Sequence, residues 1–287
     1  MTVRVKKPVK ITVITVLVLV GALVGADYGL AAAAEYQVSK KMRTELNLTS
    51  DPSVDIHGFP FITQALAGDY RDIAIDAAGV PVNSQLRDLE IAADLHDVRV
   101  KLSDLLAGNV QQVKVAEVDG QVKVKSTDIG RVLRIPDLSV NPVSLDTVLG
   151  TGAQDTEDAK DHIQDPGGSD SGSGPDQLAG KAGVEMSGTI DLAGERTKVN
   201  AFGVISLSDG AVVITPKKLQ LTNGLVSGDL PDGLLQSFAH LFQVRLSSSN
   251  LPLPFTVRAT GVDVQSGAIV VGGTANNIVL SANSVNP

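Results

Sequence analysis

The sequence contains four histidines, which can act as general acids, general bases or metal ligands, together with many serines and aspartates. They are His57, His96, His162 and His240. A histidine beside a serine would support acyl transfer, and closely spaced histidines would bind a metal ion. The sequence contains no Gly-x-Ser-x-Gly, His-Glu-x-x-His or phosphate-binding Gly-x-x-x-x-Gly-Lys-Ser/Thr motif. A triad assembled only by folding stays open, but the pattern predicts no catalytic residue, no metal site and no cofactor.

The acidic residues suggest little further chemistry. Asp72 and Asp76 are interpreted as solvent-facing. Residues 154–177 contain seven acidic side chains among glycines and serines. They lack the Asp-x-Asp-x-Asp-Gly…Glu order of an EF-hand calcium loop. We therefore interpret this acidic segment as a solvated, disordered insertion.

Composition excludes several classes of function. The chain has 287 residues, a formal net charge of −8, 3% aromatic residues and no cysteine. Nucleic acids require a basic face, and single strands also require aromatic stacking platforms, so a nucleic-acid partner is not expected. Without cysteine there can be no disulfide, thiolate nucleophile or iron–sulfur cluster.

The N-terminus has the pattern of an export signal or a membrane anchor. Arg4, Lys6, Lys7 and Lys10 precede an uncharged apolar run, residues 11–26, which ends at Asp27. Its length lies between that of a signal-peptide core and the roughly 20 residues of a full span. Cleavage after Val24-Gly25-Ala26 and retention as an anchor both stay open, although an anchor extended past Asp27 would place that charge at a costly depth. The basic flank predicts an internal N-terminus and an external body. We divide the chain into a signal or anchor (1–29) and a body (30–287).

Two helices are predicted after this run. One has apolar residues at every fourth position, which indicates an amphipathic helix. These residues are Leu30, Ala34, Val38, Met42 and Leu46. The second is short, because Pro60 can open a helix and Gly68 can end it.

The rest of the chain alternates with period two, which is typical of antiparallel strands with one wet face. Strands are expected over 70–75, 89–102, 186–192, 198–207, 211–215, 217–222 and 257–271, with the last broken by a turn at 265–267. Asp119-Gly120 predicts a hairpin turn. Ser126 predicts a cap for a helix through Leu133, and a further helix is expected over 233–244. These elements indicate an α+β body built mainly from antiparallel strands.

The segment from His57 to Tyr70 resembles the hallmark of the LmeA-like family of actinobacterial envelope proteins. It reads His-Gly-Phe-Pro-Phe-Ile-Thr-Gln-Ala-Leu-Ala-Gly-Asp-Tyr, with Ile62 where the family usually has Leu. The C-terminal part is also similar, through Leu253-Pro254-Phe255, the strand 262–264, Gly267 and Val279-Leu280. The acidic insertion departs from compact members.

The resemblance implies a phospholipid-binding protein outside the plasma membrane, in the periplasm, with a role in envelope lipid or lipoglycan assembly. It also implies a tubular, TULIP-like fold, in which a curved antiparallel sheet wraps around helices. We expect lipid contacts from Phe59, Phe61, Ile62, Leu66 and Tyr70, and a headgroup contact from Arg71. Core packing of the short helix, with Arg71 simply on the surface, is the alternative for these residues.

Two other functions stay open. An envelope phospholipase or esterase would need a serine or aspartate beside a histidine in one cleft. A non-enzymatic scaffold for cell-wall glycolipid synthesis would have a filled interior and an exposed apolar patch. The bound partner is therefore expected to be a phospholipid or a glycolipid, with membrane contact through residues 11–26.

Overall fold

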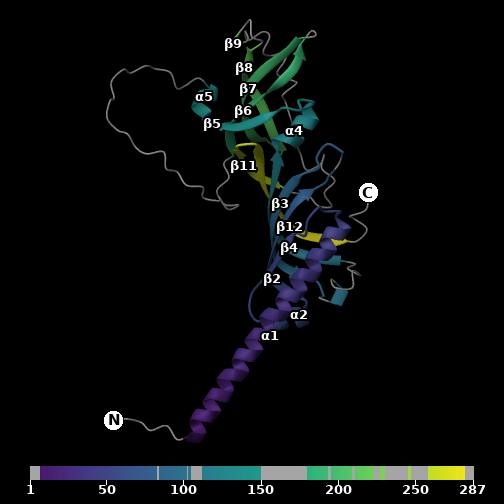
Figure 1. The fold of residues 1–287 in the computed structure, drawn as a ribbon, viewed down its shortest axis with the longest axis vertical. Helices are drawn as coiled ribbons and strands as arrows, with labels where there is room; N and C mark the ends of the chain where they lie inside the picture. The colour runs from purple at the N-terminus through teal and green to yellow at the C-terminus, as the bar shows by residue number, and fades with distance from the viewer. Residues whose placement is uncertain are drawn as a thin grey trace, which may run out of the picture. The chain divides into compact units, whose positions relative to one another are not determined.

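The computed structural model describes residues 7–82, 84–101, 103–104, 112–149, 180–192, 195–208, 211–222, 227–229, 245–246 and 258–281. Figure 1 shows the helices and strands. The helices are α1 (Lys7–Glu45), α2 (Phe61–Ala67), α4 (Ser126–Leu133) and α5 (Leu145–Leu149). The strands are β1 (Ser53–His57), β2 (Asp69–Val80), β3 (Leu89–Arg99), β4 (Gln112–Lys125), β5 (Ser139–Val143), β6 (Lys181–Leu192), β7 (Glu195–Ser208), β8 (Ala211–Thr222), β9 (Ser227–Asp229), β10 (Arg245–Leu246), β11 (Arg258–Gln265) and β12 (Ala268–Ser281). The acidic insertion, the helix predicted over 233–244 and Leu253-Pro254-Phe255 lie outside the described residues.

The strands form two antiparallel sheets, which confirms the predicted α+β class. One has the order β1-β2-β3-β4-β12-β11, and the other has the order β10-β8-β7-β6-β5 with β9 paired to β8. Both sheets are open within the described ranges. Two open sheets together with a long N-terminal helix fit the expectation of a curved sheet over a helix.

The chain divides into two compact units. Unit 1 comprises residues 1–77, 93–118 and 276–287, and unit 2 comprises residues 78–92 and 119–275. Unit 1 therefore contains α1, β1 and α2, whereas unit 2 contains α4, α5 and the second sheet. The division between a signal or anchor at 1–29 and a body at 30–287 stays a prediction, and α1 runs through residue 29 without a break.

Helix α1 confirms the predicted helix but buries only part of the predicted apolar stripe, since Ala34 is buried and Val38 and Met42 are half-buried. Leu30 and Leu46 are exposed, whereas Ala31, Ala34 and Ser39 are buried. Helix α1 packs against β1 and α2 in unit 1. Small side chains let neighbouring backbones approach closely, so we infer that the small residues Ala31, Ala34 and Ser39 make this contact.

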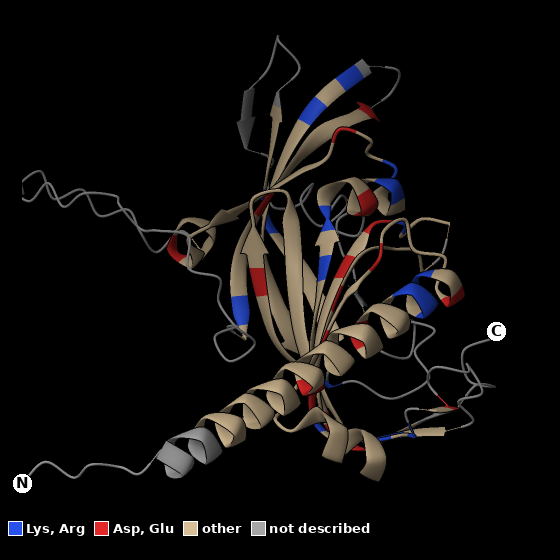
Figure 2. Cartoon of the chain, turned by 60° about the horizontal axis from the view of Figure 1, so that its bottom comes forward, with Lys and Arg blue, Asp and Glu red and all other residues tan. Residues whose placement is uncertain are grey.

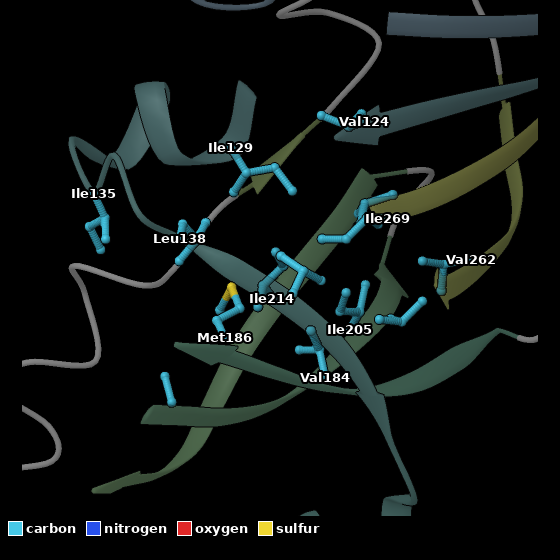
Figure 3. Packing of buried hydrophobic residues seen from close by; sticks show 14 of the residues in the cluster. Val124, Ile129, Ile135, Leu138, Val184, Met186, Ile205, Ile214, Val262 and Ile269 are labelled. Atoms are coloured by element: carbon cyan, nitrogen blue, oxygen red, sulfur yellow. The ribbon is translucent and has the colours of Figure 1, made fainter. Parts of the chain in front are cut away.

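The core of unit 2 is aliphatic and lies on its sheet. Val184 and Met186 of β6, Ile205 of β7 and Ile214 of β8 are almost fully buried in one cluster (Figure 3). The predicted meander is confirmed, with β6 paired to β7 and β7 paired to β8. The separate strand expected over 217–222 is wrong: β8 is continuous, with a register shift between Phe202 and Gly203 on β7. A bulge of this kind tolerates a proline in a strand, and Pro216 is the partner of Gly203.

Two local predictions are wrong. Asp119-Gly120 makes no hairpin, because β4 runs through it and is paired with β3 and β12. The expected turn needs positive φ, and Gly120 is not among the described glycines with positive φ. Helix α4 has the predicted bounds, but Lys125 is its N-cap and no side chain caps it, so Ser126 is not the cap. The Ser126 amide instead donates to the Gly267 carbonyl at 2.7 Å, and Gly267 lies in the predicted β11–β12 turn.

Candidate functional site

The motif that carries the family resemblance follows β1, which runs antiparallel to α1. Three contacts show this direction, because residues further along the chain after α1 contact residues nearer the N-terminus of α1. They are Arg43 Nη1 with Asp51 Oδ1 at 3.2 Å, Ser39 Oγ with the Pro52 carbonyl, and Ile56 N with Glu35 Oε1 at 2.9 Å. The chain that leaves β1 is therefore directed back toward the apolar half of α1.

Asp27 fixes the start of α2 on α1. The backbone N–H groups of Phe61 and Ile62 each donate to one of its carboxylate oxygens at 2.8 Å. Pro60, the N-cap of α2, provides no side-chain cap, so Asp27 does from another helix what a capping side chain usually does from the same chain segment. A carboxylate at a helix N-terminus is also favoured by the helix dipole. Asp27 is only 4% exposed, so the first charge after the apolar run is enclosed by protein.

Gln64 holds the turn before α2 and the strand after it. Its Nε2 donates to the Gly58 carbonyl at 3.0 Å, and its Oε1 accepts from the Arg71 amide at 3.1 Å. Gly58 has φ of +103°, and a Cβ there would lie 2.8 Å from Gln64 Nε2. Gly68 ends α2 in the left-handed conformation, as predicted. The motif residues thus have a direct structural role, which is to seat α2 against α1.

The six predicted lipid contacts do not form one wall. Phe61 and Tyr70 are buried, with ring centroids 6.4 Å apart. Ile62 is half-buried and Arg71 is exposed. Phe59 is 53% exposed and Leu66 is 84% exposed. Core packing thus describes Phe61 and Tyr70, while lipid contact by any of the six stays a prediction.

Sequence reasoning missed two members of this site, Asp27 as the partner of α2 and Tyr28. Tyr28 is 64% exposed and its ring stacks on Phe59, with centroids 6.1 Å apart. An available signal is its position two residues after the apolar run, because tyrosine is enriched at the membrane–water boundary.

Tyr70 has a polar atom without a partner. Its side chain is fully buried, its hydroxyl makes no hydrogen bond to any residue that the structure describes, and burial raises its pKa. Removing an unsatisfied buried hydroxyl relieves a desolvation cost. We therefore expect Tyr70→Phe to leave the unfolding free energy of the lipid-free protein unchanged or to raise it by up to about 1–2 kcal/mol. The melting temperature should stay the same or rise accordingly. A clear loss of stability in a thermal melt would show that the hydroxyl has a partner.

The described histidines do not form a catalytic arrangement by themselves. His57 is exposed on β1, and His96 Nδ1 lies 3.5 Å from Asp72 Oδ1 with both side chains more than a third exposed. His162 and His240 lie outside the described residues. Among the residues that are described, no group of three or more acidic or histidine side chains could hold a metal ion.

One helix of the described chain, Ile14–Glu45 within α1, is long and apolar enough to cross a membrane by length and composition. Residues 14–26 of α1 contain no charged side chain, and this part of the helix is tan in Figure 2. No curated protein and no solved structure gives a significant match to the chain. The model of the LmeA-like phospholipid-binding family matches residues 25–274. That span begins inside α1, includes the α2 motif and ends in β12. Because it covers most of the sequence, the chain belongs to the LmeA-like phospholipid-binding family.

Proposed function

We propose that this protein binds phospholipid in a bacterial cell envelope, with its folded body outside the plasma membrane and α1 in that membrane. The observation that carries the proposal is the family match over residues 25–274. We further propose that the bound lipid is transferred or presented for envelope lipid or lipoglycan assembly. This role would suit a phospholipid-binding body that is held at a membrane.

The membrane half of the proposal is supported by α1. The described residues 14–26 are uncharged, and nearly all of them are exposed. A helix that is apolar all round needs an apolar environment, and a bilayer provides one. Lys7 and Lys10, together with Arg4 and Lys6 before the helix, favour a cytoplasmic N-terminus by the positive-inside rule.

The lipid half assigns different roles to the six predicted residues. Phe59, Ile62 and Leu66 present apolar surface from the α2 segment, and the exposed Arg71 is available to pair with a phosphate headgroup. Phe61 and Tyr70 support these contacts from inside unit 1. Each methylene moved from water to protein would contribute about 0.8 kcal/mol, so an acyl chain, not the headgroup, would supply most of the affinity.

Native mass spectrometry of the full-length protein tests the proposal. The protein is purified from bacterial envelope in detergent and washed with excess detergent to remove lipid around α1. We expect one phospholipid to remain per chain, and we expect Arg71→Gln to lower retention of anionic phospholipid several-fold. Arg258→Gln, at an exposed arginine of β11, is the matched control and should leave retention unchanged.

Two results would contradict the proposal. A protein that carries no lipid and ignores added phospholipid would favour the scaffold function. Release of fatty acid and lysophospholipid from added phospholipid would favour the hydrolase.

A further inference from the structure

We propose that α2 lies on the outer surface of the same bilayer that α1 enters, with Tyr28, Phe59 and Leu66 in contact with lipid. This inference rests on the membrane half of the proposed function and adds a second membrane contact to it. The contact surface, which we call the α2 foot, consists of Tyr28, Phe59, Ile62 and Leu66 and belongs entirely to unit 1.

The α2 foot is apolar and largely open. Leu66 is more exposed than any other large hydrophobic residue for which burial is described, and Tyr28 and Phe59 are more than half exposed as a stacked pair. Ile62 lies one turn before Leu66, so the two share a face of α2. The segment from Gly58 to Gly68 contains no charged residue. A single exposed leucine would be ordinary, but an uncharged segment that also exposes a stacked aromatic pair is typical of a lipid-facing surface.

Asp27 sets the position of this foot along α1. Leu23 lies four residues earlier and is exposed, so the rise of an α-helix places it about 6 Å from Asp27 along the axis. The carboxylate of Asp27 is bonded to the first two residues of α2. Helix α2 therefore begins at the level where the apolar run of α1 ends.

The length of α1 then places that level in the bilayer interface. The run over residues 11–26 is shorter than the roughly 20 residues that cross a hydrocarbon core. However, Asp27 is enclosed by α2, and no other charge occurs before Glu35. The exposed apolar surface of α1 thus continues past Asp27 through Leu30 to Ala33, which is long enough to span. Counting roughly 20 residues from Ile11 puts the outer boundary near Leu30, about 5 Å beyond Asp27.

This depth suits an interfacial helix. Such helices bury their apolar face about 5–10 Å into the boundary between headgroups and acyl chains, and tyrosines gather at the same level. The occupant that the geometry favours is therefore the bilayer, because the α2 foot is continuous with the apolar surface of α1. A second copy of the chain would instead have to cover the α2 foot while α1 sits in lipid.

Single-cysteine labelling in the full-length protein tests this inference, since the natural chain has no cysteine. Leu66→Cys, Val18→Cys and Ser53→Cys all replace exposed residues. Each variant carries an environment-sensitive fluorophore and is reconstituted in phosphatidylethanolamine–phosphatidylglycerol vesicles with spin-labelled quencher lipids. Ser53 is the aqueous control, because its neighbour Pro52 contacts Ser39, twelve residues or about 18 Å beyond Asp27 along α1.

We expect strong quenching at residue 18 by deep quenchers, strong quenching at residue 66 by shallow quenchers, and less than a tenth of either at residue 53. Quenching at residue 18 with residue 66 behaving like residue 53 would overturn the inference and leave the anchor in place. A blue-shifted label at residue 66 that no lipid quenches would also overturn it and would indicate a protein partner or second copy. Absence of quenching at residue 18 would contradict the anchor itself.

Discussion

Asp27→Ala should release α2 from α1. The carboxylate accepts two short hydrogen bonds from α2 and is almost completely buried. Alanine would leave the amides of Phe61 and Ile62 without a partner at a helix start where Pro60 offers no side-chain cap. Hydrogen bonds to a charged group contribute about 1.5–3 kcal/mol each. Because the two bonds share one carboxylate and are not fully additive, we expect local opening of α2 to become about 2–4 kcal/mol easier.

Hydrogen exchange measures this directly in the detergent-solubilised full-length protein. The amides of Phe61 and Ile62 should exchange about 30-fold faster or more, since 1.4 kcal/mol corresponds to a factor of ten. Asp27→Asn keeps one acceptor oxygen and should fall between the wild type and alanine. Asp76→Ala, at an exposed aspartate of β2, should leave both amides protected. Unchanged exchange at Phe61 and Ile62 in Asp27→Ala would mean that the α2 motif is held by other contacts.

The contact of Asp27 with α2 illustrates what the sequence could and could not predict. The bounds of α2 follow from local signals, because Pro60 and Gly68 act through their own backbone conformations. The partner of its N-terminus does not, because the two groups are 34 residues apart. In the sequence alone, Asp27 is an unfavourable charge at the end of an apolar run. Folding encloses it, and so removes the conflict between this charge and a membrane anchor.

The strands β6, β7 and β8 follow from the sequence pattern, whereas the predicted turn at Asp119-Gly120 is wrong. Alternation of apolar and polar residues depends on the two faces of a strand, so the meander of β6, β7 and β8 was predictable. A turn at Asp119-Gly120 depends on whether the flanking strands pair with each other. Strand β4 is instead paired with β3 and β12, and the partners on both sides keep it extended through a favourable turn sequence.

Lipid contact by the six predicted residues stays a prediction, and the geometry around them could not be predicted from the sequence. The resemblance of the segment from His57 to Tyr70 points to the right family, but the sequence does not say which residues of the segment are buried and which are exposed. Which of them face solvent depends on α1, because Phe61 is buried while Phe59 stacks on Tyr28 at the surface. Exposure set by a distant helix is a tertiary property, and the sequence pattern of α2 alone does not contain it.

In unit 2, Asp128 is a second buried aspartate that joins distant segments, and its replacement should have the largest effect on stability. The side chain is fully buried in α4. Its Oδ2 accepts from the amides of Arg87 and Asp88 at 2.9 and 3.0 Å, and its Oδ1 is paired with Arg131. Removing one partner of a buried charged network costs about 3–5 kcal/mol. We therefore expect Asp128→Ala to lower the unfolding free energy of unit 2 by about that amount.

Urea unfolding followed by the circular dichroism of the sheets checks this, with Arg131→Gln as the matched variant. The glutamine removes the ion pair and the hydrogen bond from Arg131 to the Gln85 carbonyl but leaves both backbone donors on Asp128, and the Arg131 side chain is already more than a third exposed. We expect Arg131→Gln to lower the unfolding free energy by somewhat more than the 0–1 kcal/mol typical of a solvated ion pair, because Asp128 is buried. This loss should still be about 2 kcal/mol smaller than that of Asp128→Ala. Equal losses in the two variants would mean that the contacts of Arg131 with Asp128 and Gln85, not the bonds to Arg87 and Asp88, hold the segment before β3 on α4. The unequal result would instead assign to Asp128 in unit 2 the role that Asp27 has in unit 1, because in both places a buried carboxylate fixes a backbone segment by accepting two consecutive amides.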